Sequence, residues 1–172
     1  MMEPIEHESG AAALEHTEHD HEHCAEGAMA RAEAVSSAQG LRFTDQRRKV
    51  LAALAESHVP ASAYDVIDRL ALTGPRPAPI SVYRALDFLV EHGFAHRIES
   101  RNAYIACSHS TAVHGHPGAV TVFLLCDACG AAAEAASAEL AGALDAVTRA
   151  AAFTPRSPVI EIRGLCARCR TA

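Results

Sequence analysis

The chain has 172 residues, of which 49% are hydrophobic and 21% charged, and it carries a net charge of -6. This length is enough for one domain or two small ones, and the acidic balance excludes a protein that coats nucleic acid through bulk positive charge. A transmembrane segment is not expected, because the longest central apolar run, residues 119–125, is far too short to cross a bilayer.

Residues 1–39 are rich in Glu, His and Ala without a periodic apolar face, which predicts a disordered tail. The first 27 residues hold eight acidic side chains and no Lys or Arg, so 13 acidic residues face 15 basic ones in the remainder. Deleting residues 1–39 is therefore expected to leave DNA binding nearly intact. A basic n-region followed by an apolar h-region is not seen, so no signal peptide is predicted and the expected location is the cytoplasm.

Three helices and a hairpin are predicted next. The apolar spacing predicts helices over residues 44–57, 62–72 and 80–92, the second opened by a Ser62–Asp65 capping box. Two short strands follow over 94–98 and 103–106. This order predicts a winged helix-turn-helix domain over residues 40–107, which would bind DNA.

The remainder of the chain predicts a second, small α/β domain. A His-rich linker over 108–118 leads to a domain over 119–172. Strands are expected over 120–125 and 159–163, with a helix over 137–151 between them. The fold class is therefore α+β, with a winged helix followed by an α/β domain.

Two Cys-x-x-Cys turns carry the strongest chemical signal. Cys126 and Cys129 follow one predicted strand, and Cys166 and Cys169 follow the other. Each turn supplies two thiolates, and four thiolates close the tetrahedral shell of one structural zinc ion. A redox dithiol pair is the alternative, but two such motifs in one small domain favour zinc over it. Six cysteines in a cytoplasmic protein favour metal binding over disulfides.

A second group of possible ligands lies at the junction of the two domains. It consists of a histidine in the wing, a cysteine that ends the wing, three linker histidines and a glutamate: His96, Cys107, His109, His114, His116 and Glu134. A mixed nitrogen, sulfur and oxygen set suits zinc. The alternative is that none of these residues binds a metal: His96 would be a surface histidine, Cys107 a small buried thiol and Glu134 a solvated acid.

The predicted DNA contacts lie on the third helix and near the first. Ser81, Tyr83, Arg84 and Asp87 form the polar face of the third helix, where an arginine can contact guanine in the major groove. Phosphate contacts are expected from a basic cluster, Arg42, Arg47, Arg48 and Lys49. Ordinary solvated helix faces are the alternative for both groups.

Five segments in order, residues 41–47, 62–65, 81–89, 123–130 and 159–169, resemble the ferric-uptake-regulator (Fur) family, and most of all its zinc-uptake-regulator (Zur) branch. The resemblance implies a homodimer on double-stranded operator DNA, with zinc as the corepressor of zinc-uptake and homeostasis genes. It implies two zinc ions per subunit, a structural one on the four cysteines and a regulatory one.

The resemblance also implies residue roles. It places the regulatory zinc on His96, Cys107, Glu134 and one linker histidine, with His116 favoured over His114 because it stands nearer the following strand. It adds Tyr64 to the DNA contacts Ser81, Tyr83, Arg84 and Arg47. The sulfur ligand Cys107 favours zinc over iron, because the metal sites of the iron-sensing branch of the family are similar but contain less sulfur.

Other functions remain as alternatives: a sensor of iron, manganese or nickel in the same family, or a zinc-buffering protein. Hydrolysis by the second site is not expected, because four protein ligands would leave no place for a reacting water, so no enzymatic activity is predicted.

Overall fold

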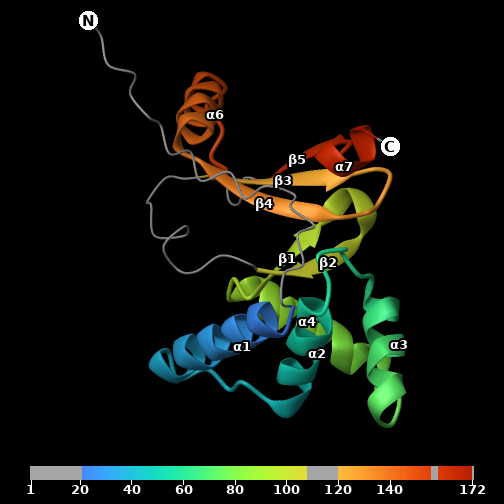
Figure 1. Cartoon of the computed structure of the whole chain (residues 1–172). Coiled ribbons are helices and arrows are strands. Elements are labelled where there is room, and N and C mark those ends of the chain that lie inside the picture. The colour runs from blue at the N-terminus through green and yellow to red at the C-terminus, as the bar shows by residue number, and fades with distance from the viewer. Residues whose placement is uncertain (1–20, 108–119, 156–158, 172) are drawn as a thin grey trace, which may run out of the picture.

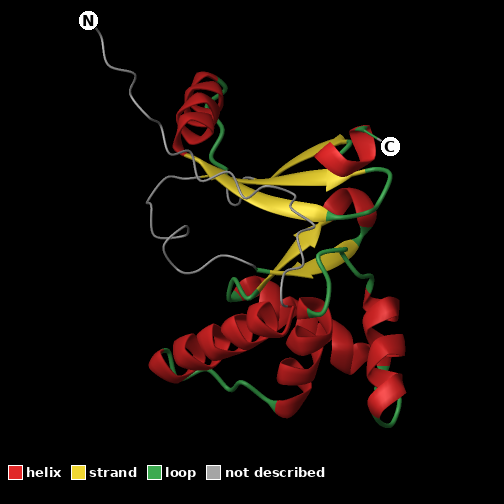
Figure 2. Cartoon of the chain, in the orientation of Figure 1, coloured by secondary structure: helices red, strands yellow, loops and turns green. Residues whose placement is uncertain are grey.

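A computed structural model describes residues 21–107, 120–155 and 159–171 of the chain. Figures 1 and 2 show a helical half and a sheet half, with a two-stranded hairpin between them. The elements in chain order are α1 His21–Ala38, α2 Asp45–Ala55, α3 Ala63–Thr73, α4 Pro79–Glu91, β1 Ala95–Ile98, η1 Glu99–Arg101, β2 Ala103–Ala106, β3 Val120–Cys126, β4 Ala132–Ser137, α6 Ala138–Ala150, β5 Val159–Gly164 and α7 Ala167–Arg170.

The core of the helical half is formed by the apolar faces of α2, α3 and α4, as their spacing predicts. Leu51 and Leu54 of α2, Ile67 of α3 and Leu86 and Leu89 of α4 are 1% exposed or less in one cluster. Thr44 caps α2 by accepting a hydrogen bond from the amide of Arg47, which satisfies a backbone group that the helix leaves unpaired.

The capping box predicted before α3 is confirmed. The Asp65 amide donates to the Ser62 hydroxyl at 3.2 Å, and the Ser62 amide donates to the Asp65 carboxylate at 2.8 Å. These hydrogen bonds lower the pKa of Asp65, with the largest contribution from the Ser62 side chain. The box therefore holds α3 at the end of the α2–α3 loop.

The prediction that residues 1–39 are disordered is wrong for residues 21–38, which form α1. Ala28, Ala32 and Ser36 are 6, 0 and 2% exposed. Met29 and Val35 are partly buried against the core of the helical half. The three buried residues are spaced by four and form a narrow face of small side chains, which pattern analysis misses because alanine and serine are weakly hydrophobic. Residues 1–20 lie outside the described part.

The hairpin completes the winged helix. β1 pairs antiparallel with β2, with His96 opposite Ile105. Asn102 takes a left-handed conformation, φ 46°, at the end of η1, and asparagine tolerates this conformation better than most residues. The N–H of Cys107 donates to the carbonyl of Phe94 at 3.0 Å, so the end of β2 is fixed to the start of β1. The predicted winged helix-turn-helix is thus present.

The sheet half has the strand order β4-β3-β5, with β3 antiparallel to β4 and parallel to β5. The helix α6 lies in the crossover between β4 and β5. Strand β4 was not predicted from the sequence, because alanine has low strand propensity and the strand forms only through pairing with β3. The short helix α7 was not predicted either.

The hairpin lies against the sheet through an apolar cluster. Ile98 and Ile105 of the hairpin pack with Phe123, Leu125 and Ala132 of the sheet, and all five are buried. This cluster joins the two halves and fixes how the hairpin faces β3 and β4. Within the described residues, no helix is both long and apolar enough to cross a membrane.

Candidate metal centres and nucleic-acid interface

Four cysteine thiols meet at one end of the sheet. Cys126 ends β3, Cys129 follows in the turn, Cys166 immediately precedes α7, and Cys169 lies within that helix. Their sulfur atoms all lie within 4.8 Å of one another. The Sγ atoms of Cys129 and Cys166 are 3.9 Å apart, close to the tetrahedral edge of about 3.8 Å that a Zn–S bond of about 2.3 Å gives.

The backbone around Cys126 favours its thiolate form. The amide of Cys166 donates to Sγ of Cys126 at 3.4 Å. Amides of Cys129, Cys166 and Ala128 lower the pKa of Cys126 to about 6, although burial opposes this. The pKa of Cys169 is raised, chiefly by its hydrogen bond with Cys166. The four thiols therefore do not lose their protons equally easily in the absence of a metal ion. A divalent cation would stabilise all four thiolates, so the donor set fits zinc.

Gly130 allows the first cysteine turn to close. Its φ is 77°, a conformation that side chains other than glycine rarely adopt. A Cβ atom there would lie 3.4 Å from Cγ1 of Val59, which precedes α3. The turn therefore needs glycine for its backbone conformation, and it lies directly against the helical half.

The second cluster is assembled across the boundary between the halves. His96 is on β1, Cys107 follows β2, and Glu134 is on β4 opposite Phe123. One ligand atom from each lies within 4.8 Å of the others. Nε2 of His96 is 3.1 Å from the Glu134 carboxylate, and the two side chains are only 18 and 6% exposed. Cys107 is 1% exposed.

The environment of His96 favours its protonated form in the absence of a metal ion. Burial by itself would lower the pKa of His96, but hydrogen bonds with Cys107 and Glu134, and the negative charges of both, raise it to about 9. The His96 ring also lies 5.2 Å from the ring of Phe123, which fixes its position over the sheet. A buried histidine, thiol and carboxylate this close form a preorganised set of ligands for a divalent cation.

The remaining candidate ligands lie outside the described residues. His109, His114 and His116 belong to the segment 108–119, so the preference for His116 over His114 stays a prediction. The described part of the chain thus provides three possible ligands of the second cluster, and a fourth from the linker stays a prediction.

The predicted DNA contacts on α3 and α4 differ in how far they are exposed to solvent. On α4, Tyr83 is 36% exposed and Arg84 is also exposed, while on α3 Tyr64 is 61% exposed. Ser81 is half-buried, and its hydroxyl donates to the carbonyl of Ala78 at 2.7 Å in the first turn of α4. Tyr83 and Arg84 are therefore free of the core and available to a ligand.

The basic cluster before and within α2 is partly engaged inside the protein. The Arg47 guanidinium lies 3.4 Å from the centre of the Phe88 ring and donates to the carbonyl of Arg42. Arg48 pairs with Glu33 of α1 at 3.4 Å, and Lys49 pairs with Asp45 at 2.8 Å. These contacts give Arg47 a packing role that sequence reasoning missed.

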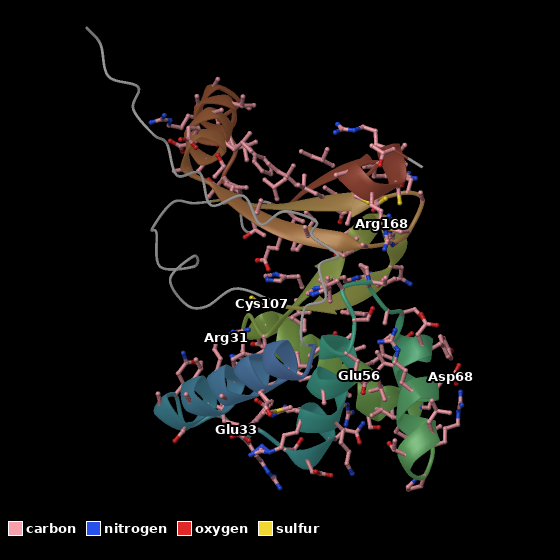
Figure 3. The ribbon with its side chains drawn as sticks, in the orientation of Figure 1. Arg31, Glu33, Glu56, Asp68, Cys107 and Arg168 are labelled. Carbon is pink, nitrogen blue, oxygen red and sulfur yellow. The ribbon has the colours of Figure 1, made fainter. Side chains whose placement is uncertain are left out.

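Three further residues make contacts between segments far apart in the sequence, and the sequence carried no signal for them. Arg101 of η1 and Glu161 of β5 make contacts between the hairpin and the sheet. Arg31 of α1 donates to the carbonyl of Cys107 at 2.5 Å, and Figure 3 places the two residues beside each other. Their partners are backbone atoms far away in sequence, which no local pattern encodes.

Comparisons with known proteins agree with these features. The model of the "Ferric uptake regulator family" matches residues 38–163. The chain is 36% identical over 141 residues to the zinc uptake regulation proteins of Escherichia coli K12 and Shigella flexneri, covering 82% of this chain and 80% of each relative.

Three solved structures match this chain to different degrees. A zinc uptake regulator complexed with zinc and DNA has a TM-score of 0.77 at 35% identity, over 86% of this chain and 95% of that one. Holo XcZur has a TM-score of 0.74 at 37% identity, over 84% of this chain and 97% of that one. Apo XcZur, equally 37% identical, has a TM-score of 0.50 over 86% of this chain and 99% of that one. At equal identity, the structure of this chain is therefore more similar overall to holo XcZur than to apo XcZur.

Proposed function

Because the chain belongs to the ferric uptake regulator family, we propose that it is a zinc-responsive transcriptional repressor rather than an enzyme. Zinc would act as corepressor of genes for zinc uptake and homeostasis, by promoting operator binding of the homodimer. The observation that carries this proposal is the second cluster, because its ligands come from the hairpin and from the sheet.

Two zinc ions per subunit would have different roles. The first, on Cys126, Cys129, Cys166 and Cys169, has four protein ligands and no open position, so it would stabilise the sheet half. The second would bind His96, Cys107, Glu134 and a linker histidine. Because these ligands belong to both halves, an ion there stabilises one relative orientation of the halves.

Zinc would control DNA binding by linkage. If an ion binds the arrangement in which the winged helices fit the operator better than it binds other arrangements, it shifts the population toward that arrangement. Bound operator must then raise zinc affinity by the same factor. The resemblance to zinc uptake regulators and the sulfur ligand Cys107 both favour zinc over iron, manganese or nickel.

Operator recognition is assigned to the exposed face of α4 and to the neighbouring α3. Tyr83 and Arg84 on α4 would contact bases or nearby phosphates in the major groove, with Ser81 at the start of the helix. Tyr64 on α3 and Arg47 on α2 would support them. The Phe88 contact of Arg47 makes its part in DNA binding indirect, through the position of α2.

A homodimer is supported by the apolar surface of the sheet half. Large hydrophobic side chains there are exposed: Leu140, Val147, Phe153, Val159, Ile162 and Leu165. No residue of α6 is buried, although the helix has an apolar side. Such a surface needs a partner, and a second copy would place two winged helices on a two-fold symmetric operator. Residues 40–107, extended by α1, would then bind DNA, and residues 119–172 would dimerise.

Footprinting of the full chain on promoter DNA of zinc-uptake genes, with zinc and after its removal, tests the proposal. Protection that requires zinc, and that iron, manganese and nickel restore poorly, is the expected result. Equal protection in the absence of metal would contradict it. Protection restored best by iron or manganese would make the chain a sensor of that metal, and no protection with several zinc ions bound would favour zinc buffering.

A further inference from the structure

The tip of the hairpin is attached to the first cysteine turn through Arg101. The Arg101 guanidinium donates to the carbonyl of Gly130 at 2.6 Å and to the carbonyl of Cys126 at 2.9 Å. It also lies 3.8 Å from the Asp127 carboxylate. The side chain is only 24% exposed, so these contacts are partly shielded from water. A planar guanidinium can donate hydrogen bonds to two carbonyls at once, whereas a lysine ammonium cannot reproduce this geometry.

The same hairpin tip is also bound by Glu161 of β5. Its two carboxylate oxygens accept hydrogen bonds from the amides of Glu99 and Ser100, at 2.7 and 3.2 Å. The register places Glu161 opposite Phe123 of β3, so the carboxylate projects from the strand next to the hairpin's apolar contact. Arg101 and Glu161 thus fix η1 to two different parts of the sheet half.

This attachment and the second metal cluster lie on the same hairpin. The hairpin carries His96 and leads to Cys107 at its base, whereas η1 is at its tip. The contacts of Arg101 and Glu161 and the cluster of His96, Cys107 and Glu134 exist only while the hairpin lies on the sheet. By linkage, any interaction that stabilises this arrangement raises the affinity of every ligand that requires it.

We propose that the first cysteine turn, residues 126–130, is the docking point of the wing tip as well as half of the four-cysteine site. The Arg101 and Glu161 contacts stabilise the arrangement that the second zinc ion needs, so they set part of that ion's affinity. Arg101 and Glu161 are positioning residues. This inference rests on the proposed function, but Arg101 and Glu161 themselves are assigned to neither zinc nor DNA binding.

The test measures zinc affinity in full-length variants by competition with a chelator, which requires no DNA. Arg101→Ala should retain the four-cysteine zinc and bind the second zinc about tenfold more weakly, which corresponds to about 1.4 kcal/mol. Glu161→Ala should weaken the second zinc in the same direction. Arg97→Ala is the matched control, because Arg97 contacts Asn102 and Glu99 within the hairpin and should leave the affinity unchanged.

Operator binding separates docking from direct DNA contact. With docking, Arg101→Ala loses operator affinity at limiting zinc and regains it at saturating zinc. Arg101→Lys keeps the charge but not the paired hydrogen bonds, so it should resemble Arg101→Ala. If Arg101 instead contacted a DNA phosphate, Arg101→Lys would keep operator affinity. Arg101→Ala would then lose operator affinity even at saturating zinc, and its DNA binding would depend less on salt. Glu161 is negatively charged and would not bind a DNA phosphate. A loss of operator affinity in Glu161→Ala therefore cannot come from a lost phosphate contact.

Second-site zinc affinity equal to wild type in both Arg101→Ala and Glu161→Ala would overturn the inference, as would a loss confined to DNA at saturating zinc. If Arg101→Ala fails to fold, Glu161→Ala decides the question. A wild-type chain whose operator binding ignores zinc would refute the proposed function, while the chelator measurement would still report on docking.

Discussion

Nε2 of His96 lies 3.1 Å from the carboxylate of Glu134, and this contact joins the wing of the helical half to β4, an edge strand of the sheet half. Both side chains are largely buried, and Cys107 lies within 4.8 Å of their ligand atoms. An ion at this point would contact both halves at once, so its proposed effect on DNA binding can be tested one ligand at a time.

Cys107→Ser should give a dimer that keeps the four-cysteine zinc but binds operator poorly at moderate zinc levels. Removal of the sulfur leaves three of the proposed ligands, so excess zinc should restore part of the binding. Zinc stoichiometry and operator affinity, measured together on the purified variant, check this. A variant with a full second zinc and wild-type operator affinity would place the sensor elsewhere.

Cys126→Ser or Cys166→Ser should unfold the sheet half and thereby abolish the dimer. Metal binding by a structural thiolate site contributes folding free energy, on the order of 10 kcal/mol in small zinc domains. Thermal unfolding, zinc content and sedimentation of each variant measure the loss. A folded, zinc-responsive dimer with either substitution would contradict a structural role for the four cysteines.

Arg84→Ala should weaken operator binding by about 1–3 kcal/mol if the side chain makes one paired contact with a base. Its exposed place on α4, away from the core, motivates the prediction. Binding to random DNA should fall much less. Equal losses on both DNAs would indicate a phosphate contact instead.

Arg31→Ala should weaken the second zinc, because the Arg31 guanidinium holds the carbonyl of Cys107 at 2.5 Å. A hydrogen bond from a charged donor contributes about 1.5–3 kcal/mol, and part of this is lost as the end of β2 loosens. Chelator competition measures the change in affinity. Glu33→Ala is a suitable control on the same helix, since Glu33 pairs with Arg48 and not with the hairpin.

Truncation separates α1 from the residues before it. Deletion of residues 1–20 should leave zinc-dependent operator binding nearly intact, whereas deletion of residues 1–38 should impair it, because α1 covers the core of the helical half. This replaces the expectation from the sequence that residues 1–39 are dispensable. Equal operator affinities for the two truncated proteins at limiting zinc would contradict it.

Zinc affinity at the second site should rise between pH 6.5 and 9. Burial opposes protonation of His96, but Cys107 and Glu134 raise its pKa to about 9, so a proton occupies the ring at neutral pH and must leave before zinc binds. In the metal-free protein, the protonated His96 stabilises the fold fully below pH 6.5, and this contribution is lost as the pH rises through 9. Chelator competition across this pH range checks the affinity, and a flat profile would contradict it.

The local features of this protein could be predicted from its amino-acid sequence. Regular apolar spacing predicted α2, α3 and α4, because an amphipathic helix must bury one face. The Ser62 capping box and the two Cys-x-x-Cys turns depend on residues close together in sequence, so their spacing carries the geometry. The winged-helix order and the four-cysteine cluster could therefore be predicted from residue spacing alone.

Features that depend on contacts between distant segments became visible in the folded chain and not in the sequence. Alanine-rich residues became α1 and β4 because a core and a neighbouring strand were present to pack with them, and alanine has no strong pattern of its own. The contacts of Arg31, Arg101 and Glu161 with remote backbone atoms exist because the folded halves bring those atoms within hydrogen-bonding distance. A backbone carbonyl or amide is the same at every residue, so sequence spacing cannot identify which of them a side chain will reach.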